Sequence, residues 1–361
     1  MATSTSDADT VPLTRPDQGY AQRRTREWLF LALALVNGIT LIFVLIAKGA
    51  SASNTTDLHA VYHQALHHAR YVDLTHSIQP GMPIWEGFAT PTFGAAVGAS
   101  TVEGFIEGGA KYTYGAQGFV ATSVTLPTDQ LGTQLDPPAH WNEFGATISD
   151  VPPTVSVRPL VVIDVTGKVA SEPGYHATAT DVLEWEATYG RVPTGSVVLF
   201  RTDWSRGWDA YATDGMPATF PGVGLSALRL LHLERSILVH GHEPLDTDGT
   251  PNLEGEAWLM HHNFMQIEGV ANLHMLPPTG ALISIGFPKV LGGTGGYARL
   301  IAICPADWPF GVAIDQQSGA PLPTQSSPLR RDGDGVMRPT PAAVPTEYCA
   351  ATSPLGCPLP P

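Results

Sequence analysis

A short segment at residues 130–140 carries three side chains whose types and spacing could do chemistry. Gln134, Asp136 and His140 place an amide, a carboxylate and an imidazole at offsets of zero, two and six. Pro137 and Pro138 exclude a regular helix, because proline lacks the backbone N–H and disfavours the α region for the residue before it. The segment therefore predicts a strand end that runs into a rigid turn. There the amide and carboxylate oxygens could bind a cation, and His140 could be a ligand or a base.

The same segment resembles the signature of the cyclase-like metallohydrolases, which reads His-x-Gly-Thr-His-x-Asp-x-Pro-x-His. Five residues match it: Gly132, Thr133, Asp136, Pro138 and His140. Gln130 and Gln134 stand where the signature has its two earlier histidines. The resemblance thus implies a subfamily in which glutamine replaces two imidazoles.

Ordered partial matches extend the resemblance over roughly residues 71–306. Residues 73–76 are similar to the family's opening segment, residues 197–204 to its central strand, and residues 267–273 to its Glu-Asn-Leu segment near the end. The implied fold is α/β, the swivelling β/β/α cyclase-like arrangement with a mixed sheet. The family is often dimeric or tetrameric, so the resemblance also implies a homo-oligomer.

The resemblance implies a set of site residues that differs from the usual one. Counting back twelve residues from Glu268, where the family has a histidine, gives Glu256, and the chain gains His242 in the segment 240–246. We therefore predict Gln134, Asp136, Glu256 and Glu268 as metal ligands, with His140 and His242 as catalytic residues. Because most of these donors are oxygens, Mn²⁺ is favoured as the cofactor and Zn²⁺ is the alternative.

Such a metal would polarise a carbonyl group and acidify a bound water, and His140 could accept that water's proton and return it to a leaving nitrogen. Trp85, Trp141 and Trp204 could wall a pocket for a flat small-molecule substrate, although core packing explains each of them alone.

Three functions are compatible with these residues, and the family resemblance implies the first. The first is a metal-dependent hydrolase of an amide or cyclic amide C–N bond in a small molecule, resembling an arylformamidase. The second is a non-catalytic domain that binds a metal or another ligand on the same scaffold. The third is a metal-dependent lyase or dehydratase. Nucleic acid is not expected as a partner, because the net charge is −14 and the main body has no cluster of lysine and arginine.

The N-terminal residues predict a membrane anchor. Four arginines lie within residues 1–26, and the run from Trp28 to Ala47 has no charge. Twenty apolar residues at helical rise span a bilayer, and preceding arginines favour a cytoplasmic N-terminus. We therefore expect a cytoplasmic segment at 1–26, a single transmembrane helix at 27–48 and an extracytoplasmic catalytic domain at the cell membrane. The alternative is a signal peptide cleaved near Ala52, with secretion of the rest.

The remaining chain divides by composition. Residues 49–70 predict a linker and a short helix, and residues 71–315 predict the catalytic domain. Residues 316–361 predict a disordered tail, because the last 41 residues hold ten prolines. Within the domain we expect strands near 159–165, 196–202, 235–240, 281–285 and 299–303, and helices at 179–189 and 225–234.

Overall fold

The computed structural model describes residues 57–314, 329–331 and 337–339. The chain divides into two compact units, residues 1–61 and residues 62–361. Of the first unit, the structure describes only residues 57–61, which begin helix α2 (Leu58–Gln64). The second unit contains the sheet and the candidate site.

The prediction of a membrane-anchored protein is corrected at this point. Within residues 57–314 and the two short strands beyond them, no helix is long and apolar enough to cross a membrane. The longest of these helices, α5 (Ala179–Tyr189), has 11 residues, whereas a span needs about 20. The predicted cytoplasmic segment, the anchor at 27–48 and the cleavage site lie outside the described residues. The hydropathy of the N-terminal run showed only that it is long enough to span a membrane, which does not establish that a span forms. The transmembrane helix and the membrane localisation are therefore not retained.

A ten-stranded mixed sheet organises the second unit. Its strand order is β12-β4-β10-β9-β7-β5-β11-β13-β1-β14. In that order the strands are Gly296–Tyr297, Gln134–Asp136, Met265–Glu268, Val239–His242, Val197–Arg201, Val157–Asp164, Ala281–Gly286, Arg299–Cys304, Arg70–Asp73 and Val312–Ala313. The four central strands β10, β9, β7 and β5 are parallel, and the flanking pairs are antiparallel. The mixed α/β class agrees with the prediction.

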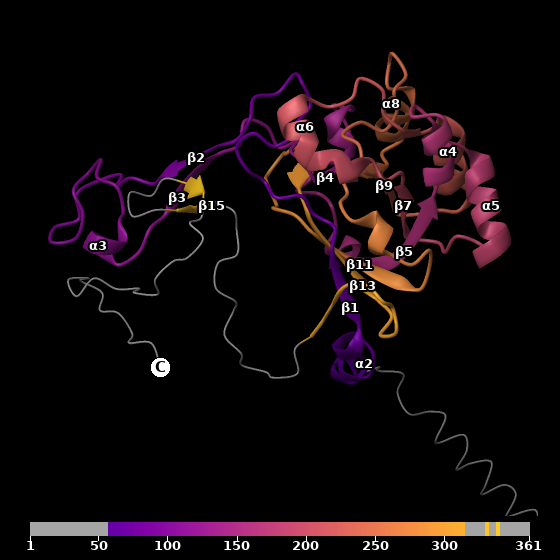
Figure 1. Cartoon of the computed structure of the whole chain (residues 1–361), viewed down its shortest axis with the longest axis horizontal. Helices are drawn as coiled ribbons and strands as arrows, with labels where there is room; N and C mark the ends of the chain where they lie inside the picture. The colour runs from indigo at the N-terminus through magenta and orange to yellow at the C-terminus, as the bar shows by residue number, and fades with distance from the viewer. Residues whose placement is uncertain (1–56, 315–328, 332–336, 340–361) are drawn as a thin grey trace, which may run out of the picture. The chain divides into compact units, whose positions relative to one another are not determined.

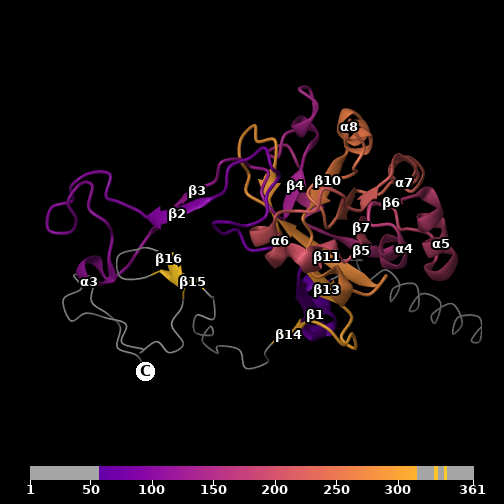
Figure 2. The same cartoon turned by 45° about the horizontal axis from the view of Figure 1, so that its top comes forward.

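Strands β5 and β7 are buried on both faces of the sheet and carry nearly continuous apolar runs, whereas β9 and β10 carry buried His, Gln and Glu side chains as well. Along β5, Leu160 and Val162 pack into the core on one face of the sheet, while Val161 and Ile163 pack into the core on the other. Helices α4 (Thr166–Ser171), α5 and α7 (Leu225–Arg229) accompany the second face, and Figures 1 and 2 show α4 and α5 side by side next to β5 and β7.

Helix α5 lies where the sequence predicts it, from Ala179 to Tyr189. Its start is set by a capping box, in which Thr178 is the N-cap and Asp181 reaches back to the Thr178 backbone N–H at 2.6 Å. The Trp185 indole donates to the Val162 carbonyl oxygen at 2.9 Å, which attaches the helix to β5. The helix expected over 225–234 continues past α7 as a π-helical turn, η5 (Leu230–Glu234), and strand β9 begins at Val239 rather than at 235.

Shorter elements complete the described structure. The remaining α-helices are α3 (Tyr114–Gln117), α6 (Trp208–Asp214) and α8 (Glu254–His261), and the 3₁₀ turns are η1 (Leu66–His68), η2 (Pro138–His140), η3 (Pro153–Val155), η4 (Trp204–Gly207) and η6 (Leu273–Met275). Three two-stranded pairs join β2 (Thr92–Ala95) to β3 (Thr122–Thr125), β6 (His176–Ala177) to β8 (Gly222–Val223), and β15 (Leu329–Arg331) to β16 (Met337–Pro339). The last pair lies within the segment predicted to be disordered, and the rest of that segment is outside the described residues.

Candidate functional site

The site begins where strands β4 and β10 pair at one side of the sheet. The antiparallel register places Gln134 opposite Glu268 and Asp136 opposite Gln266. Because side chains alternate along a strand, these four project to one face, whereas Leu135 and Ile267 between them join the core on the other face. The proline pair after Asp136 ends the strand, and the chain turns through η2 to bring His140 back toward the same place.

Four side chains form a buried network on this face. The Gln266 amide nitrogen donates to Asp136 Oδ2 at 3.1 Å and to Glu268 Oε1 at 2.7 Å. The Gln134 amide nitrogen donates to Glu268 Oε2 at 2.9 Å and lies 3.5 Å from Asp136 Oδ2. Two amide groups therefore bridge two carboxyl groups that lie at diagonal positions on neighbouring strands.

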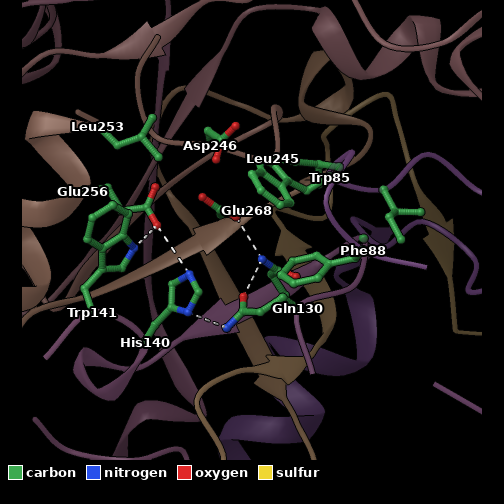
Figure 3. A pocket seen from close by; sticks show the side chains of 13 residues that line it. Trp85, Phe88, Gln130, His140, Trp141, Leu245, Asp246, Leu253, Glu256 and Glu268 are labelled. Carbon is green, nitrogen blue, oxygen red and sulfur yellow. Dashed lines mark hydrogen bonds and ion pairs between the residues drawn. The ribbon is translucent and has the colours of Figure 1, made fainter. Parts of the chain in front are cut away.

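The network opens onto a cavity of about 220 Å³, seen in Figure 3. Glu268, Gln134, His140, Glu256 and Asp246 contribute its polar wall. The apolar wall consists of Ile84, Trp85, Phe88, Trp141, Leu245 and Leu253. The cavity is thus a small aromatic chamber with several ionisable groups on one side, which is the usual build of a small-molecule site.

His140 and Glu256 form the second polar group of the chamber. His140 Nε2 lies 3.7 Å from Glu256 Oε1, and that oxygen also accepts the Trp141 indole N–H at 2.8 Å. On the other side of the ring, the Gln130 amide nitrogen lies 3.2 Å from His140 Nδ1. The Gln130 amide nitrogen also donates to the Thr294 carbonyl, which orients the Gln130 amide. Nδ1 is therefore an acceptor, and the proton of the neutral imidazole sits on Nε2 and faces Glu256.

Burial shifts the protonation of the whole group. It raises the pKa of Glu256 and of Asp246 to about 7 each. Burial, together with repulsion from neighbouring carboxylates, raises the pKa of Asp136 and of Glu268 well above the ordinary range. The pKa of His140 is lowered by burial, so its imidazole is neutral at pH 7. The chamber therefore holds groups that can exchange protons near neutral pH.

Three residues predicted for the site do not line the chamber: Asp136, which lies in the hydrogen-bonded network behind the wall, His242, whose Nε2 lies 3.8 Å from Glu268 Oε1, and Trp204. His242 is buried, with Nδ1 3.1 Å from the Pro244 carbonyl and Nε2 3.3 Å from Thr247 Oγ1. Trp204 lines a neighbouring cavity of about 680 Å³ instead. The two cavities share part of their walls, including Trp85 and Asp246.

Sequence reasoning missed Gln266 and Asp246. Gln266 is two residues before Glu268, so the alternation along a strand places both side chains on the same face. Asp246 lies four residues after His242 in a loop, where no regular period predicts its direction. The first was accessible from the sequence, and the second depended on the fold.

The metal that the family resemblance implies can be tested against the donor set. Within the described structure, Asp136 Oδ1 and Gln134 Oε1 are buried oxygens without a hydrogen-bond partner. The other oxygens of Asp136 and Glu268 accept amide N–H groups. Among the residues described, no three His, Cys, Asp or Glu side chains converge so that they could hold a metal ion. The residues present therefore do not fit the predicted Mn²⁺ or Zn²⁺ site.

Comparison with known proteins gives concordant results. The profile of a family described as putative cyclase matches residues 72–249. Isatin hydrolase of Roseibium aggregatum is 29% identical over 204 residues, which are 52% of this chain and 76% of that protein.

Solved structures of isatin hydrolase A share the fold. The protein from Labrenzia aggregata, bound to benzyl benzoate, is 27% identical with a TM-score of 0.56, over 66% of this chain and 94% of that one. The protein from Ralstonia solanacearum is 28% identical with a TM-score of 0.56, over 70% of this chain and 100% of that one.

Proposed function

We propose that this chain, which is similar to putative cyclases over residues 72–249 and to isatin hydrolase, hydrolyses an amide or cyclic amide C–N bond in a small molecule. The observation that carries the proposal is the aromatic chamber in which Glu256, with a pKa near 7, lies beside His140. A general base with a pKa near the working pH gives the best balance of correct protonation and driving force. The similarity of this chain to isatin hydrolases in sequence and fold supports a hydrolase as the reaction class.

Glu256 is the group we assign to proton transfer. Its carboxylate accepts a proton from the attacking water as the water oxygen bonds to the carbonyl carbon. It then returns that proton to the nitrogen as the C–N bond breaks, so the amine leaves neutral and the acid product keeps the water oxygen. No further reactant is required.

His140 and Trp141 position this carboxylate. The Trp141 indole N–H holds Oε1 directly, and the Nε2–H of His140 faces the same oxygen at 3.7 Å. Gln130 fixes the imidazole from behind through Nδ1. His140 therefore acts in this proposal as the partner of Glu256, and no step passes through a metal.

The apolar wall selects the substrate class. Trp85, Phe88 and Trp141 are aromatic side chains of the wall that suit a flat aromatic molecule, and the chamber volume of about 220 Å³ suits a small one. An N-formyl arylamine, an aryl lactam or an aryl imide fits this description.

The test is turnover of such a panel by the full chain. We expect hydrolysis of at least one class, and Glu256→Gln should lower kcat by about 10²–10⁴-fold, the usual scale for lost acid–base catalysis. Glu143→Gln is the matched control, because Glu143 is an exposed residue outside the chamber. Binding of the panel without turnover would instead favour a non-catalytic binding domain.

A further inference from the structure

The hydrogen bonds between β4 and β10 determine what the chamber can hold. Each carboxylate of the pair Asp136 and Glu268 is contacted by two amide nitrogens, those of Gln134 and Gln266. Three of the four carboxyl oxygens, Asp136 Oδ2 and both of Glu268, therefore have an amide nitrogen close by, and in the described structure Asp136 Oδ1 has no hydrogen-bond partner. Amide donors and a cation compete for the same carboxyl oxygen lone pairs.

Neighbouring residues fix the direction of both amides. The Gln134 nitrogen also donates to Gln130 Oε1 at 2.8 Å, and the Gln130 nitrogen donates to the Thr294 carbonyl at 2.8 Å. The Gln266 oxygen accepts the Thr247 hydroxyl. Turning either amide to present oxygen to a cation would break these bonds and place oxygen against oxygen. The donors are therefore held in place by a network that extends beyond the site.

The nearby imidazoles are also committed to other partners. His140 faces Gln130 and Glu256, and both ring nitrogens of His242 lie near the Pro244 carbonyl and the Thr247 hydroxyl. A zinc site needs three or four protein ligands and Mn²⁺ prefers several oxygens, whereas Asp136 Oδ1 and Gln134 Oε1 are the two buried oxygens of this network that have no hydrogen-bond partner in the described part of the chain.

We infer that this chain holds no transition metal in the chamber, and that the amides of Gln134 and Gln266 stabilise the Asp136–Glu268 carboxylate pair in its place. The replacement of histidine at 130, 134 and 256 is then one linked change, because the new side chains supply the N–H donors and the base that the network uses. The inference concerns metal binding alone, so its failure is distinguishable from failure of the proposed hydrolysis.

The first experiment measures metal binding by the full chain. Protein that has been treated with a chelator and dialysed is titrated with MnCl₂ and, separately, ZnCl₂ in a calorimeter, and its Tm is measured with each metal. We expect no saturable one-to-one binding and no change in Tm, because a ligand present at about 100 times its Kd would stabilise the fold measurably. One equivalent of bound metal with a raised Tm, lost in Asp136→Asn, would overturn the inference.

A pair of variants tests the network from the other side. Gln130→His/Gln134→His/Glu256→His restores the donors of the family signature, and we expect it to gain metal-dependent stabilisation that the natural chain lacks. Gln266→Leu removes one bridging amide and should lower the Tm at neutral pH by several degrees, because it leaves buried carboxylate oxygens without donors. An unchanged Tm in Gln266→Leu would contradict the role of the amides, even if the triple variant failed to fold.

Discussion

Glu256→Gln should make the protein more stable at alkaline pH while it removes activity. The side chain keeps its shape, and its amide oxygen can still accept the Trp141 indole N–H that lies 2.8 Å from Glu256 Oε1. What is lost is a carboxyl group that is buried and whose pKa is raised from 4.5 to about 7, with burial as the main cause. Glutamine does not ionise, so the variant avoids the cost of a buried charge.

The size of the effect follows from linkage. A folded-state pKa above the unfolded value means that the folded protein binds the proton more tightly. The stabilisation that tighter proton binding by Glu256 gives the folded state is therefore fully present below pH 4.5 and is lost as the pH rises through about 7. A shift of this size corresponds to about 3 kcal/mol at 1.36 kcal/mol per pKa unit. For a domain of this size that is roughly 6–12 °C in Tm.

The assay is urea unfolding of the natural chain and of Glu256→Gln at pH 4.5 and pH 8.5. We expect the free-energy difference between the two proteins to move in favour of the variant by about 3 kcal/mol between these pH values. Glu143→Gln, at an exposed position, should show no such change. A difference that stays constant with pH, or that favours the natural chain at pH 8.5, would refute the assignment of a raised pKa to Glu256.

Three further changes have defined outcomes. The indole N–H of Trp141 lowers the pKa of Glu256 by donating to its carboxylate. Trp141→Phe removes this donor and should raise that pKa, so the midpoint of the pH–kcat profile should move to higher pH. Leu135→Ala opens a cavity in the core behind the site, where Leu135 is fully buried, and should cost about 2–5 kcal/mol in urea unfolding. Arg235→Ala breaks a bidentate ion pair with Glu186, at 2.7 and 2.9 Å, in which Arg235 is buried and Glu186 partly buried, and should cost about 1–3 kcal/mol by the same measurement.

The sequence alone determined the class of fold and the place of its main elements. Long runs of Val, Ile and Leu predicted the buried strands, and the helix expected over 179–189 is α5. These signals are local, because they depend on side-chain period and on capping within one turn. A local signal also predicted the membrane anchor, which no described helix supports, because length and hydropathy do not specify whether a span forms.

Part of the site could also be predicted from the order of residues within short segments. The spacing of Gln134 and Asp136 placed both side chains on one face of a strand, and the proline pair predicted the turn that returns His140. The motif resemblance indicated Glu256 and Glu268 as members of the site, and both line the chamber.

Only the tertiary structure decided what these residues do to one another. The register of β4 against β10 brings Gln266, 130 residues away along the chain, within 3.1 Å of Asp136, and no local pattern encodes such a pairing. The pKa of Glu256 is set by the atoms that exclude water from it, and these come from distant segments. Whether an oxygen meets a cation or an amide N–H is likewise a property of packed neighbours. The residue types therefore indicated where chemistry occurs, and the fold decided which groups carry the protons and charges.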